Sequence, residues 1–135
     1  MSANTHIRTK SVRSDIHPRR DGLRILVTRI RGRGLSKERY DTWMANLGLS
    51  EQLLDKIQSD KVIWQEFKRA YKAELFQSAD IDKRNELIRN KGQKFTLRLI
   101  QRLAQTGNVT LLCHCAEDEM HCHRYVLKQI LDGKI

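Results

Sequence analysis

Two short stretches of the chain carry apolar residues at both odd and even positions. They are residues 23–30, LRILVTRI, and residues 109–115, VTLLCHC. Strands that are apolar on both faces are typical of the buried centre of a parallel sheet. We therefore predict two central strands over these ranges. A weaker alternation of polar and apolar residues over residues 6–12 predicts an edge strand.

Between the two central strands, apolar residues recur at intervals of three and four, as on the buried face of a helix. The pattern predicts a helix over residues 37–47 that begins at Ser36, a short helix from Ser50 to about residue 58, and a helix over residues 61–77. Residues 80–105 are expected to be helical in one or two pieces, and a closing helix ends the chain. The buried stripe expected in residues 80–105 is Phe95, Leu99, Ile100 and Leu103.

The order strand, helices, strand, helix predicts the α/β class, with the two central strands parallel. We expect a small, mainly parallel sheet of about three strands, flanked by helices. A chain of 135 residues is long enough to bury the core of one domain. The expected organisation is a single α/β domain over residues 1–135, with residues 1–5 mobile.

The parallel arrangement predicts where a ligand binds. In open α/β sheets, ligands bind beyond the carboxyl ends of the strands. Two unusual loops follow the predicted strand ends, RIRGRGLSK at residues 29–37 and CHCAEDEMHCHR at residues 113–124. If the two strands are neighbours, these loops meet.

Charge is concentrated at the beginning of the chain. The net charge is +10, and residues 1–40 hold eleven Lys or Arg against three acidic residues. Such a basic region favours phosphate-bearing partners, meaning a small anionic ligand, a nucleotide or nucleic acid, and a solvated basic face is the alternative.

No apolar run is long enough to span a membrane, so a cytoplasmic location is expected. Three cysteines are an odd number, which favours reduced thiols over a disulfide framework.

The second loop contains a candidate metal site. Two thiolates and two imidazoles satisfy the tetrahedral coordination of zinc. The predicted ligands of zinc or iron are Cys113, Cys115, His121 and His123. A metal-stabilised binding module is therefore one of the alternatives for this protein.

An anion pocket is the leading interpretation of the two loops together. Arginine side chains supply forked donors, glycine lets the backbone approach a ligand, and the amides at a helix start attract an anion. The predicted ligand-binding residues are Arg29, Arg31, Arg33, Gly34, Ser36, Lys37, Cys122 and Arg124.

Whether the pocket also catalyses a reaction stays open at this point. A thiolate near a helix start is a candidate nucleophile, and a carboxylate or imidazole beside it is a candidate base. The predicted reactive groups are Cys115, Glu117 and His123. A tyrosine-phosphatase signature is excluded, because position 121 is His where that signature requires Arg.

Three stretches of the chain resemble a known family in order and spacing. They are GLRILVTRIRGRGLSKERYDTW, WQEFKRAYKAEL and VTLLCHCAEDEMHCHRYVLKQIL. Together they resemble the YeaO-like proteins, domain of unknown function 488, from about Ile7 to Leu131. The resemblance implies a small α/β protein and supplies no established activity. The chain departs from the family pattern at Thr28 and at Arg31–Gly32.

Overall fold

The computed structural model describes residues 6–59, 63–76, 92–119 and 121–134. The expected mobility of residues 1–5 and the expected helix over residues 80–91 lie outside these ranges. No helix in the described part of the chain is both long and apolar enough to cross a membrane.

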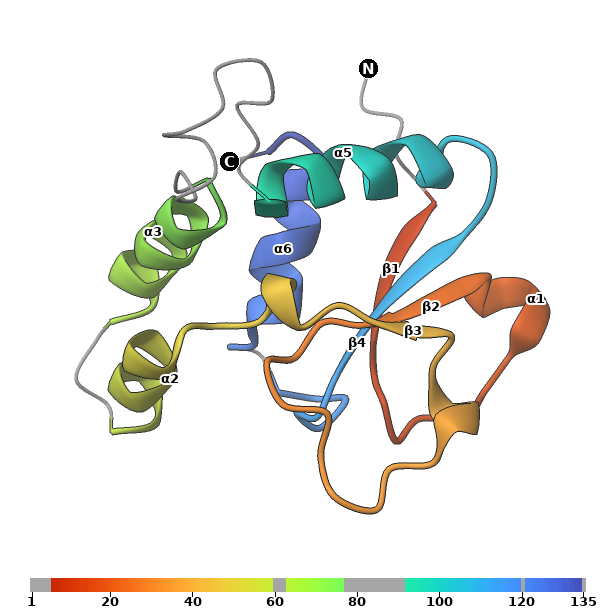
Figure 1. Cartoon of the computed structure of the whole chain (residues 1–135), viewed down its shortest axis with the longest axis horizontal. Coiled ribbons are helices and arrows are strands. Elements are labelled where there is room, and N and C mark those ends of the chain that lie inside the picture. The colour runs from red at the N-terminus through yellow and green to blue at the C-terminus, as the bar shows by residue number, and fades with distance from the viewer. Residues whose placement is uncertain (1–5, 60–62, 77–91, 120, 135) are drawn as a thin grey trace.

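Within these ranges, four parallel strands form the sheet, in the order β1-β4-β2-β3 (Figure 1). Their bounds are β1 Ile7–Ser11, β4 Val109–Cys113, β2 Leu23–Leu26 and β3 Thr42–Trp43. The predicted α/β class, the edge strand and the parallel central strands are confirmed. The expected count of about three strands is one short, because β3 was not predicted. β2 ends at residue 26 rather than 30, and β4 ends at residue 113 rather than 115.

The helix predicted over residues 37–47 is wrong. This segment contains a 3-10 turn η1 (Lys37–Arg39), β3, and a second 3-10 turn η2 (Ala45–Leu47). The carboxylate of Asp41 accepts hydrogen bonds from the backbone and guanidinium of Arg24, at 2.8 and 3.0 Å. The N–H of Met44 donates to the carbonyl of Leu26 at 2.9 Å. These bonds to β2 hold the segment extended and override its local helical pattern.

The described residues form four longer helices, which lie together on one side of the sheet (Figure 1). They are α2 Glu51–Gln58, α3 Trp64–Leu75, α5 Gly92–Ala104 and α6 His123–Leu131. The predicted start of α2 is confirmed, because the Ser50 hydroxyl accepts from the N–H of Leu53 at 3.1 Å. The stripe predicted for α5 is confirmed at Ile100, which is buried, and wrong at Leu99 and Leu103, which are 51% and 38% exposed. This helix also packs through Leu97 and Ala104, which were not predicted.

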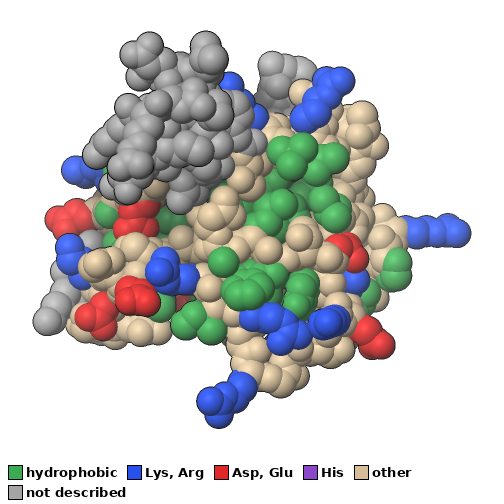
Figure 2. All heavy atoms as spheres, in the orientation of Figure 1, with side chains coloured by type: hydrophobic (Ala, Val, Ile, Leu, Met, Phe, Trp, Pro, Cys, Tyr) green, Lys and Arg blue, Asp and Glu red, His purple; other side chains and the backbone are tan. Residues whose placement is uncertain are grey.

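The opposite face of the sheet is covered by irregular chain. Leu26 and Leu112 point to this side and pack against Leu35 and Tyr40 of the segment after β2. The one-turn helix α1 (Pro18–Asp21) also lies here, where the hydroxyl of Thr110 donates to the Asp21 carbonyl at 2.7 Å. Figure 2 shows hydrophobic side chains interspersed with Lys and Arg on the face that carries α5 and β3. The helix-covered side therefore holds the main core, and the site lies at one of its ends.

Candidate functional site

The loops after β2 and β4 meet around a pocket of about 320 Å³. The Val27 carbonyl lies 2.7 Å from Nε2 of His123, and the Ile30 carbonyl lies 3.3 Å from Nε2 of His114. The predicted meeting of the two loops is confirmed. The pocket is lined by Thr28, Arg29, Ile30, Leu49, Leu54, Ile57, Gln58, Phe67, Cys113, His114, Cys115, His121, Cys122 and His123.

The register of the sheet explains this meeting. β2 and β4 are adjacent and parallel, with Leu26 paired to Leu112, so both chains leave the sheet at the same edge. Gly32 then passes beside the ring of His114 with a φ of 94°. A Cβ atom at position 32 would lie 2.8 Å from that ring, so an alanine here would displace the ring in addition to straining the positive φ.

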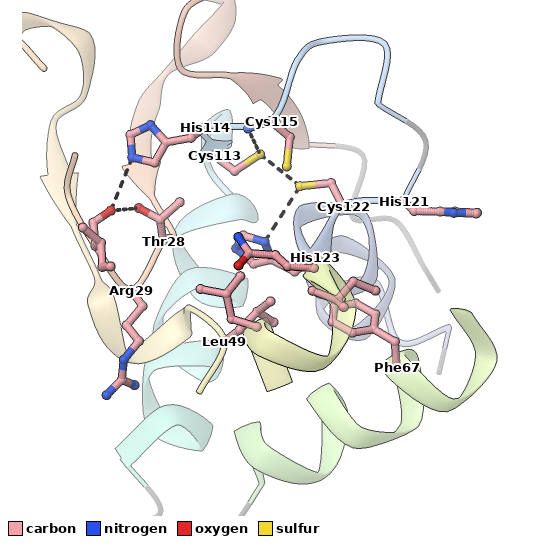
Figure 3. Close-up of a pocket in the computed structure, with 14 residues that line it drawn as sticks. Thr28, Arg29, Leu49, Phe67, Cys113, His114, Cys115, His121, Cys122 and His123 are labelled. Atoms are coloured by element: carbon pink, nitrogen blue, oxygen red, sulfur yellow. Dashed lines mark hydrogen bonds between the residues drawn. The ribbon is translucent and has the colours of Figure 1, made fainter. Parts of the chain in front are cut away.

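The sulfur atoms of all three cysteines converge at one end of the pocket (Figure 3). We call Cys113, Cys115 and Cys122 the sulfur cluster. Its Sγ atoms all lie within 4.8 Å of one another, and those of Cys113 and Cys122 are 3.0 Å apart. All three are free thiols; Cys113 and Cys122 are buried, whereas Cys115 is half-buried. The last residue of β4, the following turn and the residue before α6 each contribute one thiol.

Arg124 lies buried beside the sulfur cluster and donates a hydrogen bond to it. Its side chain is fully buried, and its Nη1 donates to Cys113 Sγ at 2.7 Å. Nη2 donates to the carbonyl of Ala116 at 3.1 Å and to the Tyr125 hydroxyl at 2.8 Å. Nε is buried and has no hydrogen-bond partner among the described residues. The guanidinium therefore shapes the loop and places a positive charge beside the sulfurs.

The three thiols influence one another's ionisation. Hydrogen bonds from the thiols of Cys113 and Cys122 lower the pKa of Cys115, and the positive charge of Arg124 acts in the same direction. The Cys113 thiol donates to Cys115, which raises the pKa of Cys113 to about 11. The hydrogen bond between Cys122 and Cys113 raises the pKa of Cys122 still further. The three thiols therefore lose protons as one coupled set, and a first negative charge is shared among sulfurs that lie within 4.8 Å of one another.

His123 is held in one tautomer. Burial lowers its pKa, so the ring is neutral at pH 7. Nε2 faces the Val27 carbonyl, which only accepts, so Nε2 carries the proton. Nδ1 is then the acceptor, and the Cys122 thiol donates to it with its Sγ 3.8 Å away. The ring of Tyr71 meets the imidazole edge-on at 5.7 Å between centroids.

The predicted anion-binding residues do not gather at one point. Arg29 lines the pocket, 3.9 Å from the carboxylate of Glu51. Arg31 turns away and donates to the Tyr40 hydroxyl and, at 2.6 Å, to the Leu35 carbonyl. The remaining loop residues are exposed and do not line the pocket: Arg33, Gly34, Ser36 and Lys37. Ser36 does cap η1, accepting from the N–H of Glu38 at 3.2 Å.

The predicted metal and catalytic residues are also separated. His121 stacks on Trp64, with ring centroids 4.5 Å apart, and points away from the sulfurs (Figure 3). The carboxylate of Glu117 lies outside the pocket, where it accepts from the Ser14 hydroxyl and, at 3.3 Å, from the N–H of Ser11. The structure instead brings Cys122 to Cys113 and Cys115, with His123 beside them.

Several pocket residues carry no chemical signal in the sequence. The apolar wall consists of Leu49, Leu54, Ile57 and Phe67. Their helical spacing marks them as core residues, and nothing in that spacing distinguishes a side chain that faces a neighbour from one that faces a cavity.

The chain matches a family model described as the active DUF488-N3 subclade, over residues 7–134. No curated protein and no solved structure matches it.

Proposed function

The chain belongs to the DUF488 (YeaO-like) family, and from this premise we propose that its pocket binds a small nucleotide-class ligand, a flat ring that carries a phosphate. The observation that carries this proposal is the meeting of the loops after β2 and β4 around one cavity. Ligands of parallel α/β sheets bind at this position.

The size and lining of the pocket favour binding of the flat ring of the ligand. Its volume of about 320 Å³ lies at the small end for ligand sites, which suits one base with its sugar rather than a dinucleotide. Leu54, Ile57 and Phe67 offer an apolar surface on which a flat ring packs. The hydroxyl of Thr28 and the ring of His114 are polar groups that distinguish one ring from another.

Arg29 is the residue that we expect to bind the phosphate of the ligand. Its side chain is 46% exposed, and its pairing with Glu51 at 3.9 Å is long and solvated, so the guanidinium is available to an incoming anion. Forked guanidinium donors suit phosphate oxygens. Arg124 is not part of this contact, because its guanidinium is buried against the sulfur cluster.

We also propose that the pocket catalyses a reaction. The matched subclade is described as active, which supports a chemical role for the pocket. Of the reactive groups expected from the sequence, Cys115 and His123 line the pocket and Glu117 does not. We assign the chemistry to the sulfur end of the pocket, without naming the reaction.

Calorimetric titration with the four ribonucleoside monophosphates tests the proposal, with the matching nucleosides as phosphate-free controls. Arg29→Ala should weaken monophosphate binding about tenfold, equivalent to about 1.4 kcal/mol, and leave nucleoside binding unchanged. Arg33→Ala is the matched control, because this arginine belongs to the same loop but does not line the pocket. It should change affinity less than about twofold.

A second pair of variants tests the ring position. Ile57→Trp should fill the pocket and abolish binding, whereas Ile57→Met, which conserves volume, should retain it. Absence of binding by all four monophosphates, or equal losses in the Arg29 and Arg33 variants, would contradict the proposal.

A further inference from the structure

The sulfur cluster has the spacing of a metal-binding set. Tetrahedral zinc with thiolate bonds of about 2.3 Å places its sulfur ligands about 3.8 Å apart. The three Sγ atoms lie within 4.8 Å of one another, and the closest pair is separated by 3.0 Å. Side-chain rotations of less than about 1 Å therefore bring all three to coordination distance.

His123 supplies a nitrogen in the correct chemical form. Metal-binding histidines usually donate their second N–H to a carbonyl or carboxylate, which fixes the ring and leaves the other nitrogen free. The Nε2 of His123 has this contact with the Val27 carbonyl at 2.7 Å. Its unprotonated Nδ1 accepts from the Cys122 thiol at 3.8 Å, close to the separation of about 3.5 Å between nitrogen and sulfur on one zinc ion, so a metal would replace the thiol proton between them.

Charge also favours a cation among the sulfurs. Three thiolates this close together repel one another strongly, and a divalent ion removes that repulsion. Three thiolates and one divalent ion leave a net charge of −1 beside the buried guanidinium of Arg124, whose other nearby anion is the exposed carboxylate of Glu117 at 3.8 Å. Its Nη1 lies 2.7 Å from Cys113 Sγ, the N–H to sulfur contact that stabilises a metal-bound thiolate.

We propose that Cys113, Cys115, Cys122 and Nδ1 of His123 bind one zinc-class divalent metal ion. Soft thiolate ligands with one imidazole select zinc over magnesium or calcium. The metal site lies at the sulfur end of the nucleotide pocket proposed above. It goes beyond that proposal, because metal binding requires neither the apolar wall nor Arg29. It also differs from the set expected from the sequence, because Cys122 replaces His121.

Metal analysis of the full chain, purified without a histidine tag and under a reducing agent, is the direct test. We expect about one zinc per chain. After removal by a chelator, cobalt(II) should restore one ion per chain. It should show thiolate-to-cobalt charge transfer in the near ultraviolet and the strong visible bands of a tetrahedral ion.

Three variants locate the ion. Cys115→Ser changes the half-buried thiol, so the fold is expected to survive, and metal affinity should fall more than about 100-fold. His123→Gln should shift the visible cobalt bands. His121→Ala is the matched control, an exposed histidine two residues away, and should leave both affinity and spectrum unchanged. Circular dichroism of each apo variant confirms that it folds.

Several outcomes would overturn the site. One is the absence of both bound zinc and cobalt uptake in reduced, folded protein. A second is iron accompanied by inorganic sulfide, which indicates a cluster rather than a single ion. A third is an unchanged cobalt spectrum in folded Cys115→Ser or His123→Gln. None of these outcomes affects monophosphate binding by the apo protein, so the two proposals fail separately.

Discussion

The loop over residues 114–119 separates two unlike cavities. On one side lies the pocket, walled by apolar side chains and closed by the sulfur cluster. On the other lies a basic groove of about 720 Å³. We define the basic groove by its lining residues, Arg8, Thr9, Lys10, Arg13, Ser14, Asp15, His17, Arg20, Asp21 and Glu117. Cys115 belongs to the first cavity and Glu117, two residues later, to the second.

The comparison shows that charge and reactive chemistry are separated in this molecule. Most of the groove cations, such as Arg8, Arg13 and Arg20, are exposed to water, where a charge contributes little to stability. Each cavity nevertheless has one buried charged residue beside it. Arg124 lies next to the pocket, and Asp21 lines the groove. Stability should therefore respond to these two residues and much less to the exposed charges.

Replacing Arg124 should have the largest effect. Arg124→Met removes the buried positive charge together with its hydrogen bonds to Cys113 Sγ and to the Ala116 carbonyl, and only the backbone N–H groups of Cys115 and Glu119 still donate to these two acceptors. We expect a loss of about 3–5 kcal/mol in the free energy of unfolding, measured by urea denaturation of the apo protein. Arg124→Lys retains the charge but not the fork, so it should recover less than half of the loss. A loss below about 1 kcal/mol would show that the loop does not depend on this guanidinium.

Asp21→Asn should have the second largest effect. The carboxylate accepts from the His17 N–H at 2.9 Å and pairs with Lys10 at 3.1 Å. Burial raises the pKa of Asp21, but these contacts outweigh it and hold the pKa below its ordinary 3.8. The carboxylate therefore stabilises the fold above pH 3.8, and this contribution is lost as the pH falls through the lowered pKa.

At pH 7 the variant should lose about 2 kcal/mol of unfolding free energy, and the gap to the wild type should close in acid. Denaturation at a series of pH values measures both. Asp15→Asn, an exposed aspartate in the same groove, is the control and should differ little from the wild type. A gap that stays constant with pH would mean that the ionised carboxylate is not responsible.

The contact between the two loops can be measured with glycine variants. Gly32→Ala and Gly34→Ala both strain a positive φ, at about 1 kcal/mol each, but only Gly32 faces a neighbour, the His114 ring. Gly32→Ala should therefore cost about 1 kcal/mol more than Gly34→Ala in thermal or urea unfolding. In a His114→Ala background the difference should disappear. A difference that persists there would place the clash elsewhere.

The exposed cations of the basic groove should matter least. Arg13→Ala and Arg20→Ala should each change the unfolding free energy by less than about 0.5 kcal/mol, because water replaces their contacts. Urea denaturation at low and high salt measures this. A loss comparable to that of Asp21→Asn would indicate that the groove is part of the structural framework.

The elements that follow from local physics were predictable. The apolar runs that contain β2 and β4 and the cap at Ser50 depend on residues near in sequence. β3 was missed because two residues, Thr42 and Trp43, carry no periodic signal and become a strand only by pairing with β2. The exposed Leu99 was placed in the core because helical spacing indicates a face without showing what covers it.

The candidate site was predictable in composition and less so in arrangement. That the loops after β2 and β4 meet follows from parallel strands, and Cys113, Cys115 and His123 were expected there. The direction of a side chain in a loop is set by contacts distant in sequence. His121 therefore turned to Trp64, while Cys122 turned to the sulfurs. Arg124 was expected to face a ligand and is buried beneath the loop.

By itself, the amino-acid sequence determined the class of the fold, the parallel central strands and the pool of reactive groups, because these depend on local pattern and residue type. The tertiary structure decided which groups act together. Packing of α6 against the sheet buries Arg124, orients the Nδ1 of His123 toward the sulfurs and leaves Glu117 in the basic groove. Neighbours in a loop point in different directions, and only long-range contacts select among them.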